Sequence, residues 1–170
     1  MHRSVRLLLV AMLLGMATAC GFQLRGAYTL PYENLYIAAP DFSVVGAGLK
    51  RAIRTSGSTR LADSIEEAQA VFLPTGELRI PTILSLSSSG RVREKRLSYR
   101  YGFRVVDGKS RDLIAPVTVE LYRDVTYADS DVLAKTQEEE LLWRDMESDL
   151  VQQLMRRLAA TKPQRPADQD

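Results

Sequence analysis

The feature that constrains the fold most is a run of alternating apolar and polar residues in the middle of the chain. Between residues 91 and 106, one set of alternate positions is apolar: Leu97, Tyr99, Tyr101, Phe103 and Val105. The positions between them are mostly charged or polar, and they include Glu94, Arg96, Ser98, Arg100 and Arg104. Successive side chains of a strand point to opposite faces. The alternation therefore predicts a strand with one buried and one solvated face.

Turn signals on both sides of this strand predict neighbouring strands. Asp107-Gly108 is a strong hairpin signal, and the alternation over residues 113–122 predicts the strand that returns. On the other side, the Ser/Gly-rich residues 85–90 predict a turn. The apolar residues 70–86 before it are interrupted by two prolines and a glycine, which favours an irregular or bulged strand at a sheet edge. Residues 34–40 predict one more short strand.

Two segments have the apolar period of a helix. Residues 44–56 place Val45, Leu49 and Ile53 on one side, and Gly57 follows as an expected helix end. The region from about residue 130 to 160 carries a longer apolar stripe: Trp143, Met146, Leu150, Val151, Leu154, Met155 and Leu158. The order of elements predicts an α+β fold, with two helices packed on one face of a mostly antiparallel sheet of about four strands. We expect this domain to cover residues 20–160, with a disordered polar tail over 161–170.

The first nineteen residues have the organisation of a secretion signal. A short basic start with Arg3 and Arg6 precedes the apolar run Leu7–Met16, and small residues lead to Cys20. The apolar run is shorter than the roughly 20 residues that a membrane-spanning helix needs. An ordinary signal cut after Ala19 would leave Cys20 as a free thiol. The alternative that we favour is a lipobox-like site in which Cys20 carries the lipid, although Ala17 stands where such a site usually has leucine.

Composition excludes several classes of function. Removal of residues 1–19 takes away Arg3 and Arg6, which leaves 21 basic against 21 acidic residues, so global charge gives no argument for nucleic-acid binding. The only histidine, His2, also lies in the presumed signal. Without imidazole, and with one cysteine, the mature chain lacks the usual nucleophilic pairs and zinc ligands. Because enzyme motifs are also absent, we expect no enzymatic activity, no metal and no cofactor.

A basic segment at the start of the alternating strand is a candidate binding site. Arg91, Arg93 and Lys95 share the parity of the buried set, yet they are charged. We therefore expect the hairpin to extend beyond the helices, so that its tip stays solvated. One interpretation is a solubilising strand end. The other is a phosphate-binding tip, since a guanidinium group donates two hydrogen bonds to phosphate at once.

Three stretches of the sequence resemble one known family. Cys20-Gly-Phe-Gln-Leu-Arg-Gly26 is similar to the mature start of the lipopolysaccharide-assembly lipoprotein family LptE, which typically reads C-G-[FW]-x-L-R. The Ser-Gly turn before the strand with Tyr99 and the segment Leu133-Ala-Lys-Thr-Gln-Glu-Glu139 also agree with the family. The likeness covers nearly all of residues 20–160.

The resemblance implies a function without catalysis. Members of the family plug the lumen of the outer-membrane β-barrel LptD and contact lipopolysaccharide, and their fold is two helices against a four-stranded sheet. By the same resemblance, Cys20 anchors the chain in the outer membrane, and Gly21 after it favours that membrane. The location implied is lipid-anchored, on the periplasmic side within the barrel lumen.

The resemblance assigns lipopolysaccharide binding residue by residue. Lys135 matches the family's basic residue in the L-A-K-x-x-E stretch at the entry to the last helix. At the family's second basic position, before the turn glycine, this chain has Ser87–Ser89, so we assign that role to Arg91 or Arg93. The alternative function is a stand-alone, periplasm-facing lipoprotein that binds lipid or glycan without a barrel partner.

Overall fold

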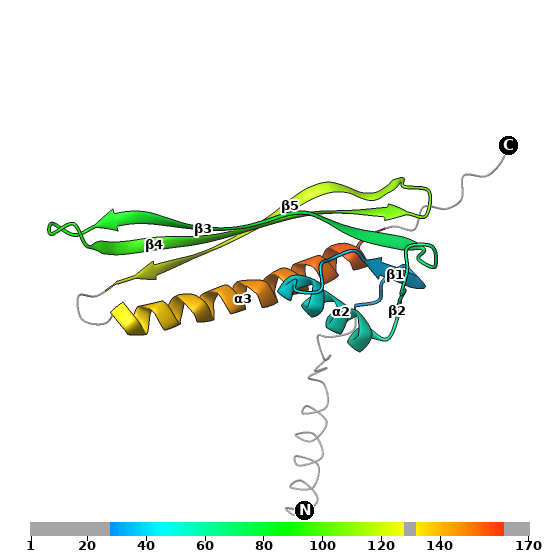
Figure 1. Cartoon of the computed structure of the whole chain (residues 1–170), viewed down its shortest axis with the longest axis horizontal. Coiled ribbons are helices and arrows are strands. Elements are labelled where there is room, and N and C mark those ends of the chain that lie inside the picture. The colour runs from blue at the N-terminus through cyan, green and yellow to red at the C-terminus, as the bar shows by residue number, and fades with distance from the viewer. Residues whose placement is uncertain (1–27, 128–131, 162–170) are drawn as a thin grey trace, which may run out of the picture.

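The computed structural model describes residues 28–127 and 132–161 as an elongated two-layer domain of one sheet and two helices (Figure 1). The elements are β1 (Asn34–Ile37), α2 (Val44–Ser56), β2 (Arg60–Leu61), β3 (Ala70–Leu86), β4 (Val92–Asp107), β5 (Asp112–Thr126) and α3 (Val132–Ala159). The expected signal segment 1–19, the expected lipid site Cys20 and the part of the expected tail from residue 162 lie outside the described residues. Thr161, at the start of the expected tail, donates a hydrogen bond from its Oγ1 to the Arg157 carbonyl at 3.1 Å.

The sheet has five strands in the order β2-β1-β3-β4-β5. The three long strands are antiparallel neighbours, whereas β1 is parallel to both β2 and β3. The predicted α+β class and mostly antiparallel sheet are confirmed, with five strands in place of about four. The additional strand is β2, whose two residues are too few to produce an alternation that sequence analysis can detect.

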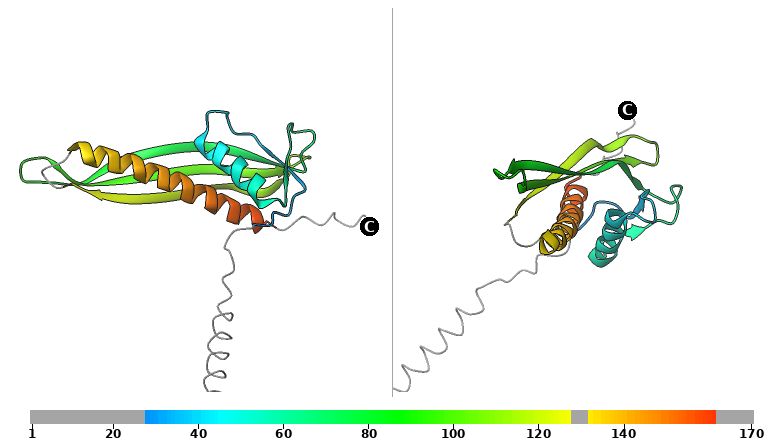
Figure 2. Two further views of the ribbon diagram at one scale, coloured as in Figure 1. Left: turned by 90° about the horizontal axis from the view of Figure 1, so that it is seen from below. Right: turned by 60° about the vertical axis from the view of Figure 1, so that its left-hand side comes forward.

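Both helices lie on the same face of the sheet, as expected (Figure 2). The Ser43 side chain caps the first turn of α2 by accepting a hydrogen bond from the Gly46 amide at 3.0 Å. Gly57 ends the helix with a φ of 67°, in the left-handed region where glycine pays no steric penalty. The two helices approach closely at Gly48, where an added Cβ would lie 2.9 Å from Val151 Cγ2. A larger side chain at this position would push α2 away from α3.

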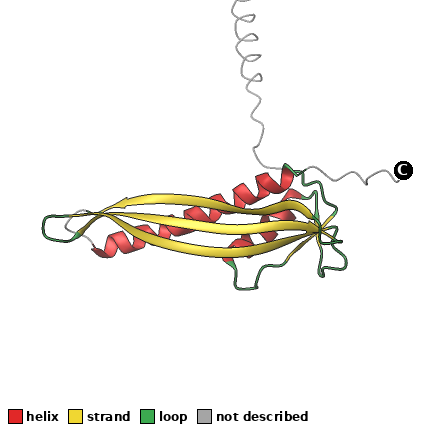
Figure 3. Ribbon diagram, turned by 90° about the horizontal axis from the view of Figure 1, so that it is seen from above, coloured by secondary structure: helices red, strands yellow, loops and turns green. Residues whose placement is uncertain are grey.

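The core lies between the long strands and the helices. The apolar side chains of β4 that alternate toward α2 and α3 are buried, and the rings of Phe72 and Phe103 stack with centroids 5.1 Å apart. From α3, the core receives the predicted stripe of Met146, Leu150, Leu154, Met155 and Leu158. Figure 3 shows β3, β4 and β5 extending along the length of α3. The alternating period of the strands and the helical period of α3 therefore meet in one continuous apolar layer.

Strand β3 has the irregularity that its prolines predict. Its register against β4 shifts between Pro74 and Gly76, and again near Ser85. On its other side it pairs with β1 only over Ala70–Phe72. Within the described residues, the remainder of β3 is therefore a sheet edge, as expected.

A polar and aromatic layer occupies the middle of the helix-facing side. The Tyr99 hydroxyl donates to the Glu77 carboxylate, and the Tyr99 ring meets the Trp143 ring edge to face at 6.1 Å. The Arg79 guanidinium lies over both rings and pairs with Glu147 of α3. Burial and, secondly, the hydrogen bond to Glu77 raise the pKa of Tyr99. Burial and then the charge of Glu77 raise the pKa of Tyr101 to about 12.

These raised values predict a loss of stability in alkali. The folded chain keeps the Tyr101 proton to a higher pH than the unfolded chain, in which the pKa of a tyrosine is about 10. The contribution to stability is therefore complete below about pH 10 and is lost as the pH rises through about 12. We expect the free energy of unfolding in urea to fall less steeply across this range in Tyr101→Phe than in the wild type. Equal slopes for the two proteins would contradict the assignment.

Candidate functional site

The candidate site is the end of the molecule formed by the β3–β4 hairpin and the start of α3. The turn is held by the Ser87 amide, which donates to the Arg91 carbonyl at 2.7 Å, and by the Gly90 amide, which donates to the Ser87 carbonyl at 2.9 Å. Gly90 has a φ of 78°, in the region that favours glycine. The hairpin projects beyond the first residues of α3 (Figure 1). Its tip is thus solvated, as the sequence predicts.

The predicted cationic residues gather at this end. Arg91 and Arg93 are exposed where β4 leaves the turn. Lys135 lies in the first turn of α3, and its Nζ donates to Glu138 at 2.6 Å. The structure thus brings all three assigned residues to the same end of the domain. Lys135, however, is neutralised locally by a carboxylate that the sequence analysis assigns to no role.

Lys95 corrects one detail of the prediction. It was expected to be solvated with Arg91 and Arg93, but α3 reaches it and leaves its side chain only 23% exposed. Its Nζ donates to Glu139 at 2.6 Å and lies 5.1 Å from the centre of the Tyr127 ring. Lys95 does lie on the helix-facing side of β4, as its position in the alternation predicts. The position at which α3 begins to cover the sheet was not predictable from β4 alone.

The opposite face of the sheet, which the helices leave uncovered, carries paired charges. Arg96 forms two hydrogen bonds to Asp124, both 2.8 Å long, and its guanidinium lies 4.7 Å from the Tyr122 ring centre. The hydrogen bonds from Arg96 lower the pKa of Asp124. Further along the same face, Arg100 pairs with Glu120 at 2.9 Å. The arginines of this face are therefore largely satisfied by carboxylates of β5.

Exposed aliphatic side chains accompany the cations of the hairpin end. Ile83, Leu84 and Leu86, on the last part of β3, are each about half exposed. The sequence predicts these residues as part of a strand and indicates no binding role for them. Their signal is a strand that stays apolar up to the turn, where it runs level with the first residues of α3 and beyond them. An end that offers both guanidinium groups and aliphatic surface can bind a molecule that has both phosphate and acyl chains.

One known protein family matches most of this domain. Residues 32–158 match the model of the family LptE, described as lipopolysaccharide-assembly. The match spans every strand of the sheet, α2, and all but the last residue of α3. The chain belongs to the LptE family.

Solved structures share the LptE-family fold described here. The solution NMR structure of an uncharacterized lipoprotein B from Nitrosomonas europaea is 39% identical, with a TM-score of 0.70, over 82% of this chain and 91% of that chain. The crystal structure of rare lipoprotein B from Shewanella oneidensis is 22% identical, with a TM-score of 0.66, over 75% and 95% of the two chains. A minor lipoprotein from Acinetobacter baumannii is 22% identical, with a TM-score of 0.63, over 77% and 93%. No curated protein sequence matches the chain.

Neither α2 nor α3 is both long and apolar enough to cross a membrane. Across residues 28–127 and 132–161, no group of three or more acidic, histidine or cysteine side chains is placed to hold a metal ion.

Proposed function

We propose that this chain is an outer-membrane lipoprotein that plugs an LptD-type β-barrel and contacts lipopolysaccharide as it passes to the outer leaflet. The observation that supports the proposal most is the LptE-family match over residues 32–158. Catalysis plays no part in this role, in agreement with the mature chain's lack of imidazole.

The surface of the domain suits the interior of a barrel. The lumen of a large outer-membrane barrel is polar and accessible to water. The open sheet face carries the pairs Arg96–Asp124 and Arg100–Glu120, which stay satisfied in such surroundings. A sheet face enclosed in such a lumen needs no apolar belt, because it faces polar surroundings.

The hairpin end supports the contact with lipopolysaccharide. Lipid A combines phosphates with acyl chains, and this end combines Arg91, Arg93 and Lys135 with the exposed side chains Ile83 and Leu86. Planar guanidinium groups hold phosphate through paired hydrogen bonds. A local cluster of cations suffices for this contact, although the mature chain is formally neutral.

The anchor in this proposal is Cys20, outside the described residues. One acyl chain gives only marginal membrane binding, whereas several chains hold a protein stably. The described domain begins at Tyr28, close to the proposed site of acylation, so the anchor would keep the plug at the membrane during assembly.

Association with a barrel is the first test. Full-length protein with a C-terminal tag, extracted from membranes in mild detergent, is expected to bring down one large heat-modifiable β-barrel protein in stoichiometric amount. Recovery of a free monomer alone would contradict the plug and favour the stand-alone lipid- or glycan-binding lipoprotein.

Charge reversal tests the lipopolysaccharide site. The triple variant Arg91→Asp, Arg93→Asp and Lys135→Asp is expected to weaken binding of purified lipopolysaccharide at least tenfold, because each charge-assisted contact contributes roughly 1.5–3 kcal/mol. Binding is measured by titration with fluorescent lipopolysaccharide at fixed salt. Barrel co-purification is expected to stay at the wild-type level.

A charge-matched control separates the site from general electrostatics. Arg51, Arg54 and Arg60 are exposed on α2 and β2, away from the hairpin end. The triple variant Arg51→Asp, Arg54→Asp and Arg60→Asp has the same net charge as the site variant. Equal loss of binding in both variants would contradict the binding site and favour the alternative, in which the hairpin cations only solubilise the strand end.

Fatty-acid labelling tests the anchor. Cells that grow with radioactive palmitate are expected to label the wild-type protein and to leave Cys20→Ala unlabelled, because the variant offers no sulfur for the acyl-glyceryl group. The readout is autoradiography of the immunoprecipitated protein. Equal label in the two proteins would remove Cys20 from the proposal.

A further inference from the structure

The first turns of α3 bring Lys135 to the same level of the domain as Arg93. The Glu139 carboxylate accepts a hydrogen bond from Lys95 Nζ at 2.6 Å, so this part of the helix lies against β4. Residues four apart share one side of a helix, which places Lys135 on the same side of α3 as Glu139. Arg93 and Lys95 likewise share one side of β4. Lys135 is one helical turn nearer the hairpin tip than Glu139, and Arg93 is two strand residues nearer than Lys95, steps of about 5 and 7 Å.

The two lysines at this end are held in different ways. Lys95 joins β4 to α3, and its ammonium group also lies 5.1 Å from the centre of the Tyr127 ring. The Lys95 and Glu139 side chains are only 23% and 19% exposed, so their pair is a structural contact between two elements. Lys135 pairs instead with Glu138, three residues along the same helix, and the Glu138 side chain is 46% exposed. Opening this second pair therefore breaks no contact between elements and leaves the carboxylate in water.

The Lys135–Glu138 pair is of the kind that a ligand can open. An exposed ion pair between residues three apart on a helix contributes little to stability, because water screens both charges. A phosphate group carries a charge of about −1.5 to −2 at neutral pH and offers three acceptor oxygens. The Lys135 ammonium group attracts phosphate more strongly than a singly charged carboxylate, and the Arg93 guanidinium can bind the remaining oxygens. A phosphate at this end thus takes Lys135 from Glu138, which stays within reach to take it back.

We propose that Glu138 is an internal competitor for Lys135 and shortens the time that a phosphate-bearing lipid stays bound at the hairpin end. The bound phosphate displaces the carboxylate, and the return of Glu138 to Lys135 favours release. Glu138 is a positioning residue, since it acts through Lys135. This inference rests on the proposed function, because the ligand is lipopolysaccharide. A protein that passes its ligand on needs release as well as capture, and affinity among related complexes is set mainly by the dissociation rate.

Removal of the carboxylate tests the inference. Glu138→Gln keeps the size of the side chain and is expected to slow the dissociation of fluorescent lipopolysaccharide about threefold to tenfold, because no negative charge then competes for Lys135. Dissociation is measured by chasing the labelled complex with unlabelled lipopolysaccharide, on full-length protein in mild detergent at fixed salt. Faster dissociation would show that Glu138 orients Lys135 for binding, and it would overturn the inference.

The two neighbouring glutamates provide charge-matched controls. Glu140→Gln removes the same charge from an exposed position about 140° around the helix from Lys135, and it is expected to leave dissociation at the wild-type rate. Glu139→Gln breaks the contact between Lys95 and α3, so it is expected to lower the melting temperature without slowing dissociation. Equal slowing in all three variants would make the general loss of negative charge the cause, in contradiction to the competition.

A double-mutant cycle separates competition for Lys135 from direct repulsion of the ligand. Lys135→Gln alone is expected to speed dissociation, because one cation of the site is lost. In that background, Glu138→Gln is expected to have no further effect, since the group for which Glu138 competes is gone. If Glu138→Gln still slowed dissociation there by its full factor, Glu138 would act by repulsion alone and the inference would fail.

The phosphate groups of the ligand are tested separately. Lipopolysaccharide from which the phosphates have been removed is expected to leave Glu138→Gln and the wild type at equal rates. A difference that survives their removal would contradict the assignment of phosphate as the competing group. Inorganic phosphate alone is expected to show no saturable binding, because it lacks the acyl chains that contact Ile83 and Leu86. Saturable binding as strong as that of lipopolysaccharide would replace the lipid by a free anion and overturn the inference.

The outcomes separate this inference from the proposed function. Lipopolysaccharide binding that is normal in the wild type and unchanged in Glu138→Gln would overturn the inference and leave the contact with lipopolysaccharide intact. Absence of lipopolysaccharide binding by the wild-type protein would overturn both.

Discussion

The burial of one side of β4 against α3 is the contact on which the rest of the structure depends. Leu97, Tyr99, Tyr101, Phe103 and Val105 are all at most 1% exposed, and they meet the apolar stripe of α3. Since a shift of one residue would exchange the two faces of the strand, this burial fixes the register of β4. The antiparallel pairing of β4 with β3 on one side and with β5 on the other then follows. The ion pairs between β4 and β5 on the open face depend on the same register. The hairpin end exists because β3 and β4 continue past the first turn of α3.

Much of this architecture could be predicted because its signals are local. The period of two over residues 91–106, the hairpin signal Asp107-Gly108 and the long apolar stripe of α3 each lie within one segment. The prolines of β3 correctly marked an irregular edge strand. By contrast, β2 consists of two residues and depends on pairing with β1, so no pattern in the sequence announces it.

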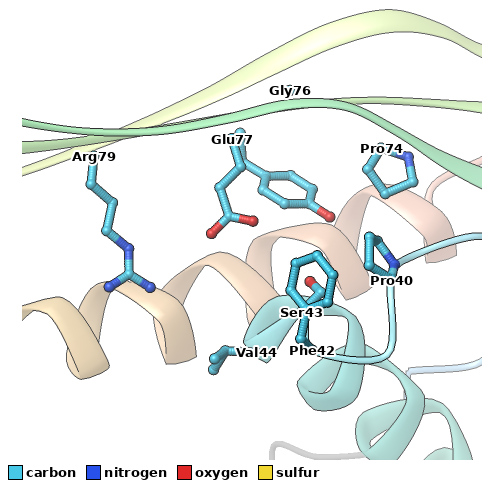
Figure 4. A pocket seen from close by; sticks show the side chains of 9 residues that line it. Pro40, Phe42, Ser43, Val44, Pro74, Gly76, Glu77 and Arg79 are labelled. Carbon is cyan, nitrogen blue, oxygen red and sulfur yellow. The ribbon is translucent and has the colours of Figure 1, made fainter.

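The site was less predictable because its details depend on contacts between distant segments. The placement of Arg91, Arg93 and Lys135 at one end follows from the topology, but the pairing of Lys95 with Glu139 depends on how α3 is aligned along the sheet. A cavity beside α2 is lined by residues of three separate segments (Figure 4). One of these residues is Tyr101, at an alternate position of β4. The alternation of β4 predicts Tyr101 as an ordinary core residue, which is right for its ring. It gives no information about the partner of its oxygen.

The length of α3 has a consequence for reach. A helix of 28 residues extends for about 42 Å. Tyr28, the first described residue, accepts a hydrogen bond from Ser58 beyond the C-terminal end of α2, at the end of the domain away from the hairpin. Tyr28 and the cationic tip therefore lie at opposite ends of the described domain, held apart along the length of α3. The packing of α3 along the three long strands thus sets the spacing between the two ends of the domain.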